Sequence, residues 1–171
     1  MGKGGEVNDC TNFQKDIKYG KVGEQIFIND FLEFLNINYE DVTDVQGFRV
    51  IDNDFVAKIG MYEIKTSYKD NKIIIIEEYT NINKDFGKES LGWFYKSKAD
   101  MMVFISKLTR TMILIPFNDK FKAYYESIKK NFELEKNRVS EHNGSMWQSA
   151  FRRIPLESLN GYFAYYKKVM R

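Results

Sequence analysis

Three side chains in one short stretch, Asp54, Glu63 and Lys65, have the types and spacing that metal-dependent hydrolysis uses. Two strand-like runs separated by a short turn predict a hairpin in which Ala57 pairs with Gly60. In that register Asp54 lies opposite Glu63, and Lys65 shares a face with Glu63 because alternate residues of a strand point the same way. We therefore expect a compact group of carboxylates with a lysine beside them.

Two carboxylates this close cannot both stay ionised at low cost, so they must share a proton, pair with the lysine or hold a divalent cation. Ligands that are all oxygen favour magnesium. A lysine beside the ion can polarise or help to deprotonate an attacking water, while the ion neutralises charge that develops on a phosphate. These residue types fit phosphodiester hydrolysis; the alternative for Glu-x-Lys alone is an ordinary cross-strand ion pair on a solvated face.

The strands around this group predict a central sheet rather than a peripheral one. Tyr62 and Ile64 alternate with the charged residues, so the other face of the same strand is apolar. The next run, Ile73-Ile74-Ile75-Ile76, is apolar on both faces, which is typical of a strand covered on both sides. Charges beside such strands are costly without a purpose, which favours the functional interpretation.

The order of these segments resembles that of the PD-(D/E)xK phosphodiesterases, the restriction-endonuclease-like nuclease superfamily, over about residues 20 to 116. Within that superfamily the chain looks most like small phage and bacterial nucleases. The resemblance implies an α/β fold with a restriction-endonuclease-like core, in which helices flank a mixed central β-sheet. The matching segments are a helix with Glu24, then Asn53-Asp54-Phe55-Val56, Tyr62-Glu63-Ile64-Lys65-Thr66, Ile76-Glu77 and the stretch from Gly92-Trp93 to Lys96-Ser97-Lys98-Ala99-Asp100.

The resemblance implies a role for each residue that matches the motif. Asp54 and Glu63 would be the metal-binding carboxylates, and Lys65 would be the catalytic lysine. The backbone carbonyl of Ile64 would be a further metal ligand, and Glu24 matches a first-helix glutamate that some members add to the metal shell. The implied cofactor is Mg2+, for which Mn2+ is expected to substitute.

Some positions depart from this pattern or leave it open. The family's Pro before the Asp is absent because Asn53 stands there, although that Pro varies widely. Asp52 lies on the same face and would be the ligand instead if the hairpin register were shifted. Glu77 would pair with Glu63 across a second hairpin with a three-residue turn, whereas a two-residue turn would bring Glu78 there.

The Gly-Trp segment contains lysines and aromatic residues that allow more than one interpretation. Lys96 and Lys98 either contact phosphates beside the scissile bond or form a solvated helix face. Trp93 and Phe94 are of a kind more often found in a core than stacked on bases.

The elements that must position these residues are predicted from hydrophobic spacing. Apolar residues at i, i+3, i+4 and i+7 predict a helix from about Lys21 to Leu35, which Asn36 can close. Glu24 lies four residues before Ile28 on that stripe and so points toward the interior. Further predicted elements are strands at 48–57, 61–67 and 72–79 in an antiparallel meander, a loop and short helix at 91–100, strands at 101–106 and 112–116, and a helix at about 119–134.

Length and composition favour one folded domain. The chain has 171 residues, of which 43% are hydrophobic and 16% aromatic, and this profile excludes disorder and low-complexity sequence. We expect residues 1–18 to be a mobile or partly ordered lead-in and the core to span about 20–134. One cysteine, Cys10, excludes an internal disulfide, and one histidine, His142, in a polar loop-like stretch, disfavours zinc-finger and Ser/His/Asp chemistry. No apolar run is long enough to span a bilayer, so we expect a soluble, cytoplasmic protein of a bacterial or phage-infected cell.

The formal net charge is only +2, but basic residues exceed acidic ones from 143 to the end, where they form either a phosphate-facing patch or a solvated face. From the residues and the resemblance together we expect a magnesium-dependent endonuclease that hydrolyses DNA with metal-activated water. The same fold could instead have lost catalysis and serve as a nucleic-acid-binding or protein-interaction module, and the substrate could be RNA or a branched DNA junction. One site cuts one strand, so duplex cleavage would need a homodimer or two encounters.

Overall fold

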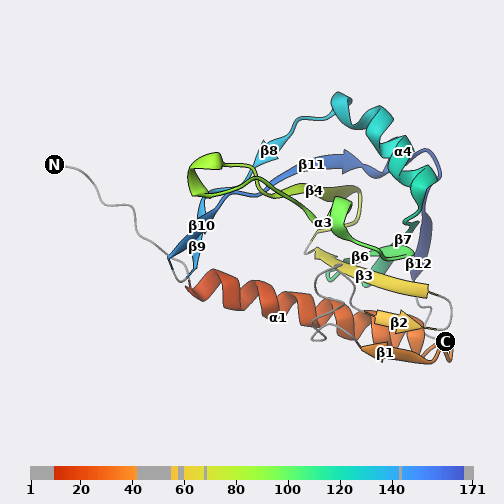
Figure 1. The fold of residues 1–171 in the computed structure, drawn as a ribbon. Helices are drawn as coiled ribbons and strands as arrows, with labels where there is room; N and C mark the ends of the chain where they lie inside the picture. Colours follow the sequence, from red (N-terminus) through yellow and green to blue (C-terminus); the bar gives the residue numbers. More distant parts are fainter. Residues whose placement is uncertain (1–9, 42–54, 58–59, 68, 143, 168–171) are drawn as a thin grey trace.

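The structure is a computed structural model that describes residues 10–41, 55–57, 60–67, 69–142 and 144–167 of the chain. Within these ranges a six-stranded, a four-stranded and a two-stranded β-sheet combine with a few helices into a mixed α/β architecture (Figure 1). The six-stranded central sheet contains both parallel and antiparallel pairs, as the sequence predicts. No helix in the described ranges is long and apolar enough to cross a membrane.

The N-terminal helix α1 spans Cys10–Phe27 and continues as a π-helical turn through Ile28–Leu32. Phe31 and Leu32 of the predicted apolar stripe are buried, whereas Leu35 is 45% exposed; Phe27, which the stripe did not include, is fully buried. Asn36 follows with φ 54°, a left-handed conformation that asparagine tolerates better than most residues. The helix itself ends at Leu32, before the predicted Leu35, and Asn36 ends the turn that follows it.

The backbone of residues 10–18, in the segment expected to be a mobile or partly ordered lead-in, is helical. The Ile17 side chain is 43% exposed. Once the second half of a helix is held by packing, each further residue adds a hydrogen bond without a new nucleation cost. The spacing of apolar residues therefore does not predict a helical segment that extends in this way.

The central sheet has the strand order β1-β2-β3-β6-β7-β12. β2 and β3 pair antiparallel with Ala57 opposite Gly60 and Phe55 opposite Tyr62, which confirms the predicted hairpin register. β3 pairs with β6 in parallel, and β6 pairs with β7 antiparallel. The strands are β1 (Tyr39–Asp41), β2 (Phe55–Ala57), β3 (Gly60–Ser67), β6 (Met101–Ser106), β7 (Thr111–Pro116) and β12 (Ala164–Lys167), so the two strands predicted at 101–106 and 112–116 are confirmed.

The strand that follows β3 leaves the central sheet, so the predicted three-stranded meander is wrong. β2 and β6 already pair with the two edges of β3, and no edge remains for β4. The connection is anchored by buried Asn71, whose side-chain amide donates to the carbonyl oxygens of Phe104 and Thr111 at 2.9 and 3.1 Å. The second sheet has the order β5 (Ser90–Leu91), β4 (Ile73–Asn81), β11 (Ala150–Pro155) and β8 (Glu135–Lys136).

The isoleucine run of β4 is covered on one face only, although the sequence predicts cover on both. Ile74 and Ile76 are 1% exposed, whereas Ile73 and Ile75 are 51% and 45% exposed. The second sheet packs one face onto the central sheet and leaves part of the other open. Four consecutive apolar residues therefore do not mean full enclosure in this strand.

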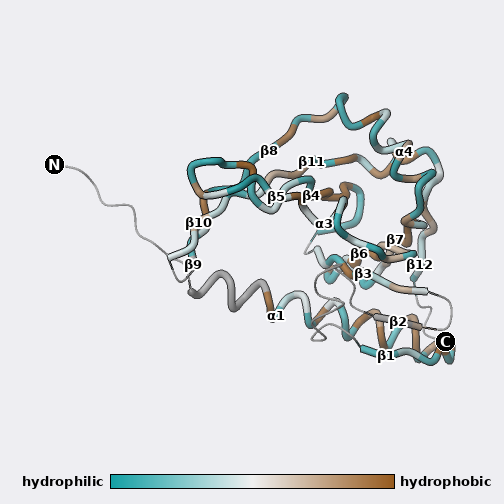
Figure 2. The backbone as a smooth tube through the Cα atoms, in the orientation of Figure 1, coloured by the Kyte–Doolittle hydropathy of each residue, from teal (hydrophilic) through white to brown (hydrophobic). Residues whose placement is uncertain are grey.

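Two hydrophobic cores lie on the two faces of the central sheet, and Figure 2 shows brown stretches along β4 and β6 that contribute to them. One core joins the sheet to α1 and includes Phe27, Tyr62 and Val103. The other lies between the central sheet, the second sheet and two helices, and includes Ile76 and Trp93. Alternate residues of one strand thus face α1 and the second sheet.

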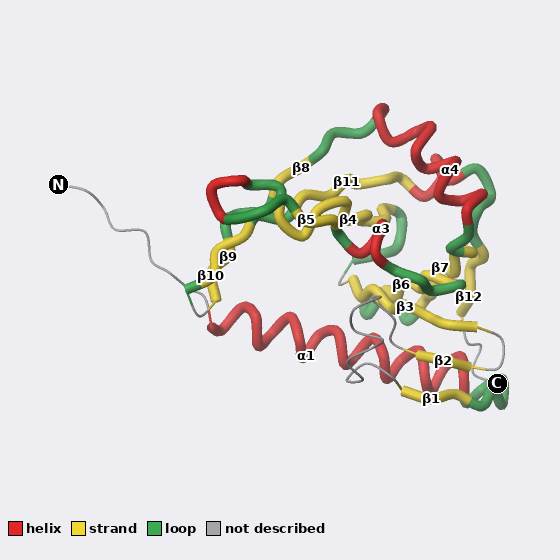
Figure 3. Tube along the Cα trace, viewed as in Figure 1, coloured by secondary structure: helices red, strands yellow, loops and turns green. Residues whose placement is uncertain are grey.

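The shorter helices lie on the side of the central sheet that faces the second sheet, as the red segments of Figure 3 show. α3 spans Trp93–Lys96, in the predicted loop and short helix. α4 spans Asp119–Ile128 and is followed by a 3-10 turn at Lys129–Asn131, so it ends before the predicted boundary near 134. Its N-cap, Asn118, accepts a hydrogen bond from the backbone N–H of Phe121 at 3.0 Å.

The C-terminal segment also contributes to the core, because Ile154 of β11 is fully buried. β9 (Ser140–His142) and β10 (Ser145–Trp147) form a hairpin, so the backbone of His142 lies in a strand rather than in the predicted loop. Two of the basic residues predicted for a patch at this end, Arg152 and Arg153, form ion pairs with acidic residues.

Candidate functional site

The side chains of Glu63 and Lys65 lie on the same face of β3 and form an ion pair. Glu63 is only 3% exposed, whereas the Lys65 side chain is 31% exposed. Tyr62 and Ile64 point the other way, into the core against α1. The predicted division of β3 into a charged face and an apolar face is therefore confirmed, and we call Glu63 and Lys65 the charged face of β3.

Trp93 forms a second contact to the lysine of this charged face. The Nζ atom of Lys65 lies 5.3 Å from the centre of the Trp93 ring, within the range of a cation–π interaction. Trp93 is 8% exposed and packs against Phe104 and Phe117, so it is a core residue with one edge turned to the site. The ammonium of Lys65 is thus held between a carboxylate and an indole.

Two glycines allow the neighbouring helices to approach this part of the molecule closely. A Cβ atom at Gly92 would lie 2.5 Å from the backbone oxygen of Glu77, so only glycine lets the start of α3 pass β4 and place Trp93. A Cβ atom at Gly23 of α1 would lie 1.8 Å from Oγ1 of Thr66, next to Lys65 in the chain. The sequence predicted no role for Gly23, because close approach is a property of the packed structure.

A pocket of about 340 Å3 adjoins the charged face, and we call it the site pocket. Lys65 lines it from the central sheet, and Glu77 lines it from the second sheet. The exposed Ile75 of β4 adds an apolar wall, and Arg153, which is paired with Glu135 at 3.0 Å, adds a cation. The site pocket therefore combines a lysine, a carboxylate and apolar surface in one hollow.

The position of Glu77 differs from the prediction. The sequence predicts that Glu77 pairs with Glu63 across a hairpin, but Glu77 lies opposite Phe151 of β11. The pairing is wrong because β4 belongs to the second sheet. Glu77 nevertheless lines the same pocket as Lys65, so packing of the two sheets brings together residues that the hairpin was expected to join.

The two candidate aspartates, Asp54 and Asp52, lie outside the described residues. The confirmed hairpin register ends at the pair of Phe55 and Tyr62. Ile64, whose backbone carbonyl the resemblance assigns to the metal, lies between Glu63 and Lys65 with its own side chain 8% exposed.

Glu24 lies on α1, half-buried, directly after the glycine that contacts β3. α1 packs on the apolar face of β3, whereas Glu63 projects from the charged face. Glu24 therefore lies on the helix that packs on one face of β3, whereas the Glu63 side chain projects from the other face. Glu24 is half-buried, which agrees with the prediction that it turns inward.

Among the described residues, no group of three or more histidine, cysteine, aspartate or glutamate side chains is arranged to hold a metal ion. The donor set on the charged face is nonetheless of the oxygen type that magnesium uses, with Glu63 on the strand and Glu77 across the site pocket. Glu63 is not among the residues that line the site pocket, so the described structure does not bring these two carboxylates together at one point.

Lys96 and Lys98 are exposed, and neither lines the site pocket. Burial, and after it the positive charge of Lys98, lowers the pKa of Lys122. Asp100, from the same segment, accepts a hydrogen bond from the backbone N–H of Met61 at 2.9 Å and so ties the start of β3 to the start of β6. In this segment Asp100 and Gly92 have structural roles that its resemblance to a nuclease motif did not specify.

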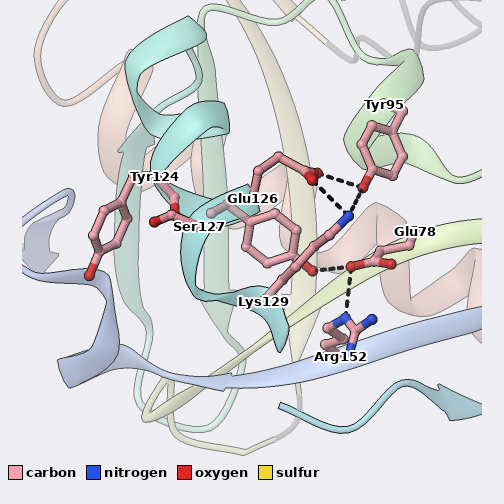
Figure 4. A network of polar contacts seen from close by, with 8 residues as sticks. Glu78, Tyr95, Tyr124, Glu126, Ser127, Lys129 and Arg152 are labelled. Carbon is pink, nitrogen blue, oxygen red and sulfur yellow. Dashed lines mark hydrogen bonds and ion pairs between the residues drawn. The ribbon is translucent and has the colours of Figure 1, made fainter. Parts of the chain in front are cut away.

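A second buried carboxylate, Glu78, has neighbours that the sequence did not connect with it. Glu78 is 2% exposed, and its Oε1 accepts hydrogen bonds from Tyr125 at 2.7 Å and from Arg152 at 2.8 Å (Figure 4). Burial, followed by the hydrogen bond to Glu78, raises the pKa of Tyr125 far above its usual value. These residues are distant in the sequence, so no local pattern could have predicted the group.

A neighbouring trio extends these polar contacts on the side of α4 (Figure 4). Tyr95 donates to Glu126 at 2.7 Å, and Lys129 contacts both Tyr95 and Glu126, at 2.9 and 2.8 Å. Burial is the main cause that raises the pKa of Tyr95 to about 12. Partial burial raises the pKa of Glu126, but the hydrogen bonds from Lys129 and Tyr95 outweigh it and lower this pKa overall.

This chain was compared with known protein families, curated proteins and solved structures. No protein-family model, no curated protein and no solved structure matches this chain. The functional argument therefore depends on the residues themselves and on their geometry.

Proposed function

We propose that this protein is a magnesium-dependent nuclease that acts on DNA through a restriction-endonuclease-like core. One observation carries the proposal: the central strand β3 pairs the buried Glu63 with the partly exposed Lys65, and this lysine lines a pocket that Glu77 of the second sheet also lines. Burying a charged pair costs free energy, and replacing such a pair by apolar residues is often neutral or stabilising. A pair retained at a pocket rather than inside a closed core therefore favours a chemical role.

The metal would be held by Asp54 and Glu63, with the backbone carbonyl of Ile64 as a further ligand. The described hairpin has the register from which the pairing of Asp54 with Glu63 is expected, and this supports the assignment. Glu24 is the weaker member of the set, because α1 packs on the opposite face of β3. Bound magnesium would supply Lewis acidity and lower the pKa of a coordinated water.

The residues of the chain have separate tasks in this proposal. Lys65 is ion-paired with Glu63 and so acts as a cation, which donates hydrogen bonds to a non-bridging phosphate oxygen and offsets its growing negative charge. The contact with Trp93 limits where that ammonium can go. The apolar wall of the site pocket, which includes Ile75, reduces the water around the reacting phosphate.

The test is a cleavage assay on supercoiled plasmid, single-stranded DNA, RNA and a four-way junction, each with magnesium, manganese or chelator. We expect metal-dependent nicking of DNA by the wild type and none with chelator. Glu63→Gln and Lys65→Ala should be inactive, Glu24→Gln should be impaired less than Glu63→Gln, and the exposed-site controls Glu133→Gln and Lys130→Ala should cleave like the wild type. Cleavage of all substrates in chelator, or full activity of Glu63→Gln, would refute the proposal.

A non-catalytic binding module is the second candidate, and one observation favours it. The described residues include no group of three potential metal-ligating side chains, and the partner of Glu63 on the charged face is a lysine. The two candidates differ in thermal unfolding with added ion, because a ligand that binds only the folded state raises the melting temperature. A rise with magnesium or manganese in the wild type that Glu63→Gln removes supports the nuclease, and equal shifts in both proteins support the module.

A further inference from the structure

A second pocket lies between α1 and the turn that joins β6 to β7, with a volume of about 510 Å3. Four cations line it: Lys18 and Lys21 from the helix, and Lys107 and Arg110 from the turn. The side-chain amides of Gln25 and Asn29 line the same hollow, and none of its described lining residues is acidic. We call this hollow the lysine pocket.

Several contacts hold these groups in place. Asp30, which is 5% exposed, accepts hydrogen bonds from Nε and Nη2 of Arg110 at 2.9 and 2.6 Å, so this guanidinium is both fixed and neutralised. The Nζ atom of Lys107 lies 5.2 Å from the centre of the Tyr19 ring. Gln25 donates to Asn29 at 2.9 Å, one helical turn apart. The excess positive charge of the pocket therefore comes from its three lysines.

The lysine pocket meets the end of β3 that lines the site pocket. The backbone N–H of Lys107 donates to the carbonyl oxygen of Ser67 at 2.8 Å. Ser67 and its neighbours Thr66 and Lys65 line the site pocket. The two pockets thus lie on the two sides of the same strand end, one against α1 and the other against the second sheet.

We propose that the lysine pocket binds phosphates of the DNA backbone and so holds the strand whose neighbouring phosphate reaches Lys65. Lysines and side-chain amides are the groups that contact phosphate and sugar without reading sequence, and the described lining of this pocket combines both with no carboxylate. This inference rests on the proposed nuclease function and adds the place where its substrate is held. Such contacts release counterions, so they predict binding that weakens as salt rises.

The experiment measures binding of a labelled duplex and a labelled single strand of about 20 nucleotides by fluorescence anisotropy, in chelator and between about 50 and 200 mM salt. The variant is the triple substitution Lys18→Ala, Lys21→Ala and Lys107→Ala. The matched control, with the same loss of charge at exposed sites elsewhere, is Lys88→Ala, Lys120→Ala and Lys130→Ala. Polyglutamate and inorganic phosphate serve as competitors.

We expect the triple variant to bind less tightly and to reduce the slope of log affinity against log salt by about 2 to 3 for the duplex, whereas the control changes it by less than about 1. Equal slopes for the variant and the control would overturn the proposal, as would displacement of DNA by polyglutamate at equal charge concentration. If the triple variant unfolds, the double variant Lys18→Ala and Lys21→Ala, both exposed, should still lower the slope by about 1 to 2.

The outcome is separable from that of the proposed function. Glu133→Gln, at an exposed position that lines neither pocket, should bind DNA like the wild type. If the wild type shows no cleavage but the triple variant loses binding, the nuclease proposal fails and the phosphate pocket stands. If the wild type cleaves and the triple variant binds and cleaves like the control, the pocket proposal fails and the nuclease proposal stands.

Discussion

Glu63 and Glu78, which are both buried among the described residues, are alike in exposure, at 3% and 2%, and each is paired with a cation. Their surroundings differ. Glu78 accepts hydrogen bonds from Arg152, whose side chain is 14% exposed, and from the buried hydroxyl of Tyr125. Glu63 is paired with Lys65, which is 31% exposed and lines a pocket. A carboxylate closed in by donors stabilises a fold, whereas one whose partner reaches a pocket can take part in chemistry.

The largest expected effect separates these glutamates by activity. Glu63→Gln and Asp54→Asn should each reduce single-turnover cleavage of supercoiled plasmid by at least about 100-fold, because each removes a charge that the reaction uses. Glu78→Gln should keep the wild-type rate where it is folded. Loss of activity in Asp52→Asn with full activity in Asp54→Asn would instead assign the metal-binding role to Asp52. If folded Glu63→Gln and Glu78→Gln lost cleavage activity to the same extent, the proposed difference between a chemical role for Glu63 and a structural role for Glu78 would be wrong.

The second expected effect is on stability and concerns the buried ion pair of Glu78 and Arg152. Arg152→Ala should lower the free energy of unfolding by about 3 to 5 kcal/mol, because it leaves a buried carboxylate without its cation. The neighbouring pair of Arg153 and Glu135 is a built-in control, since both side chains are at least a third exposed. Arg153→Ala should cost less than about 1 kcal/mol. Urea unfolding measures the stability of both variants. Similar losses in the two would mean that the buried pair of Arg152 and Glu78 stabilises the fold no more than the exposed pair does.

A third effect tests the close packing of α1 on β3. Gly23→Ala should destabilise the protein by about 1 to 3 kcal/mol, since the new methyl group would overlap Thr66. Gly20→Ala, in the same helix, should stabilise it by about 0.5 to 1 kcal/mol, because its Cβ would meet only Oε1 of Glu24 at 3.9 Å. Combining Gly23→Ala with Thr66→Ala should recover part of the loss in thermal unfolding. A stabilising Gly23→Ala would show that α1 is less tightly packed there.

The smallest effect is the pH dependence of the trio on α4. The folded state lowers the pKa of Glu126 below its ordinary value of 4.5, so its contribution to stability is complete above that pH and is lost as the pH falls through the folded pKa. Glu126→Gln should therefore lose less stability than the wild type on acidification from neutral pH. The side chain is 45% exposed, so solvent screening keeps the difference small. If the free energy of unfolding depended on pH in the same way in both proteins, Glu126 would make no such contribution.

Local pattern predicted the part of the candidate site that lies within one hairpin. The pairing of Ala57 with Gly60 follows from a short turn, and the common face of Glu63 and Lys65 follows from the period of a strand. Asn36 closes the helix as expected, because its left-handed conformation is a local preference. These features depend on residues that are close together in the chain, and the types of those residues are enough to predict them.

Long-range packing decided the rest. A turn between β3 and β4 is compatible with a hairpin, but the parallel pairing of β3 with β6 takes the edge that the hairpin needs. Glu77 reaches the site pocket through the contact of two sheets, and Glu78 meets Arg152 across 74 positions of sequence. The local sequence therefore determines that Glu63 and Lys65 share a face of β3, whereas the pocket that Lys65 lines forms only when distant strands pack. The spacing of residues along a strand determines which side chains share a face. Which faces then pack together depends on which strands pair at each edge and on how side chains fill the core.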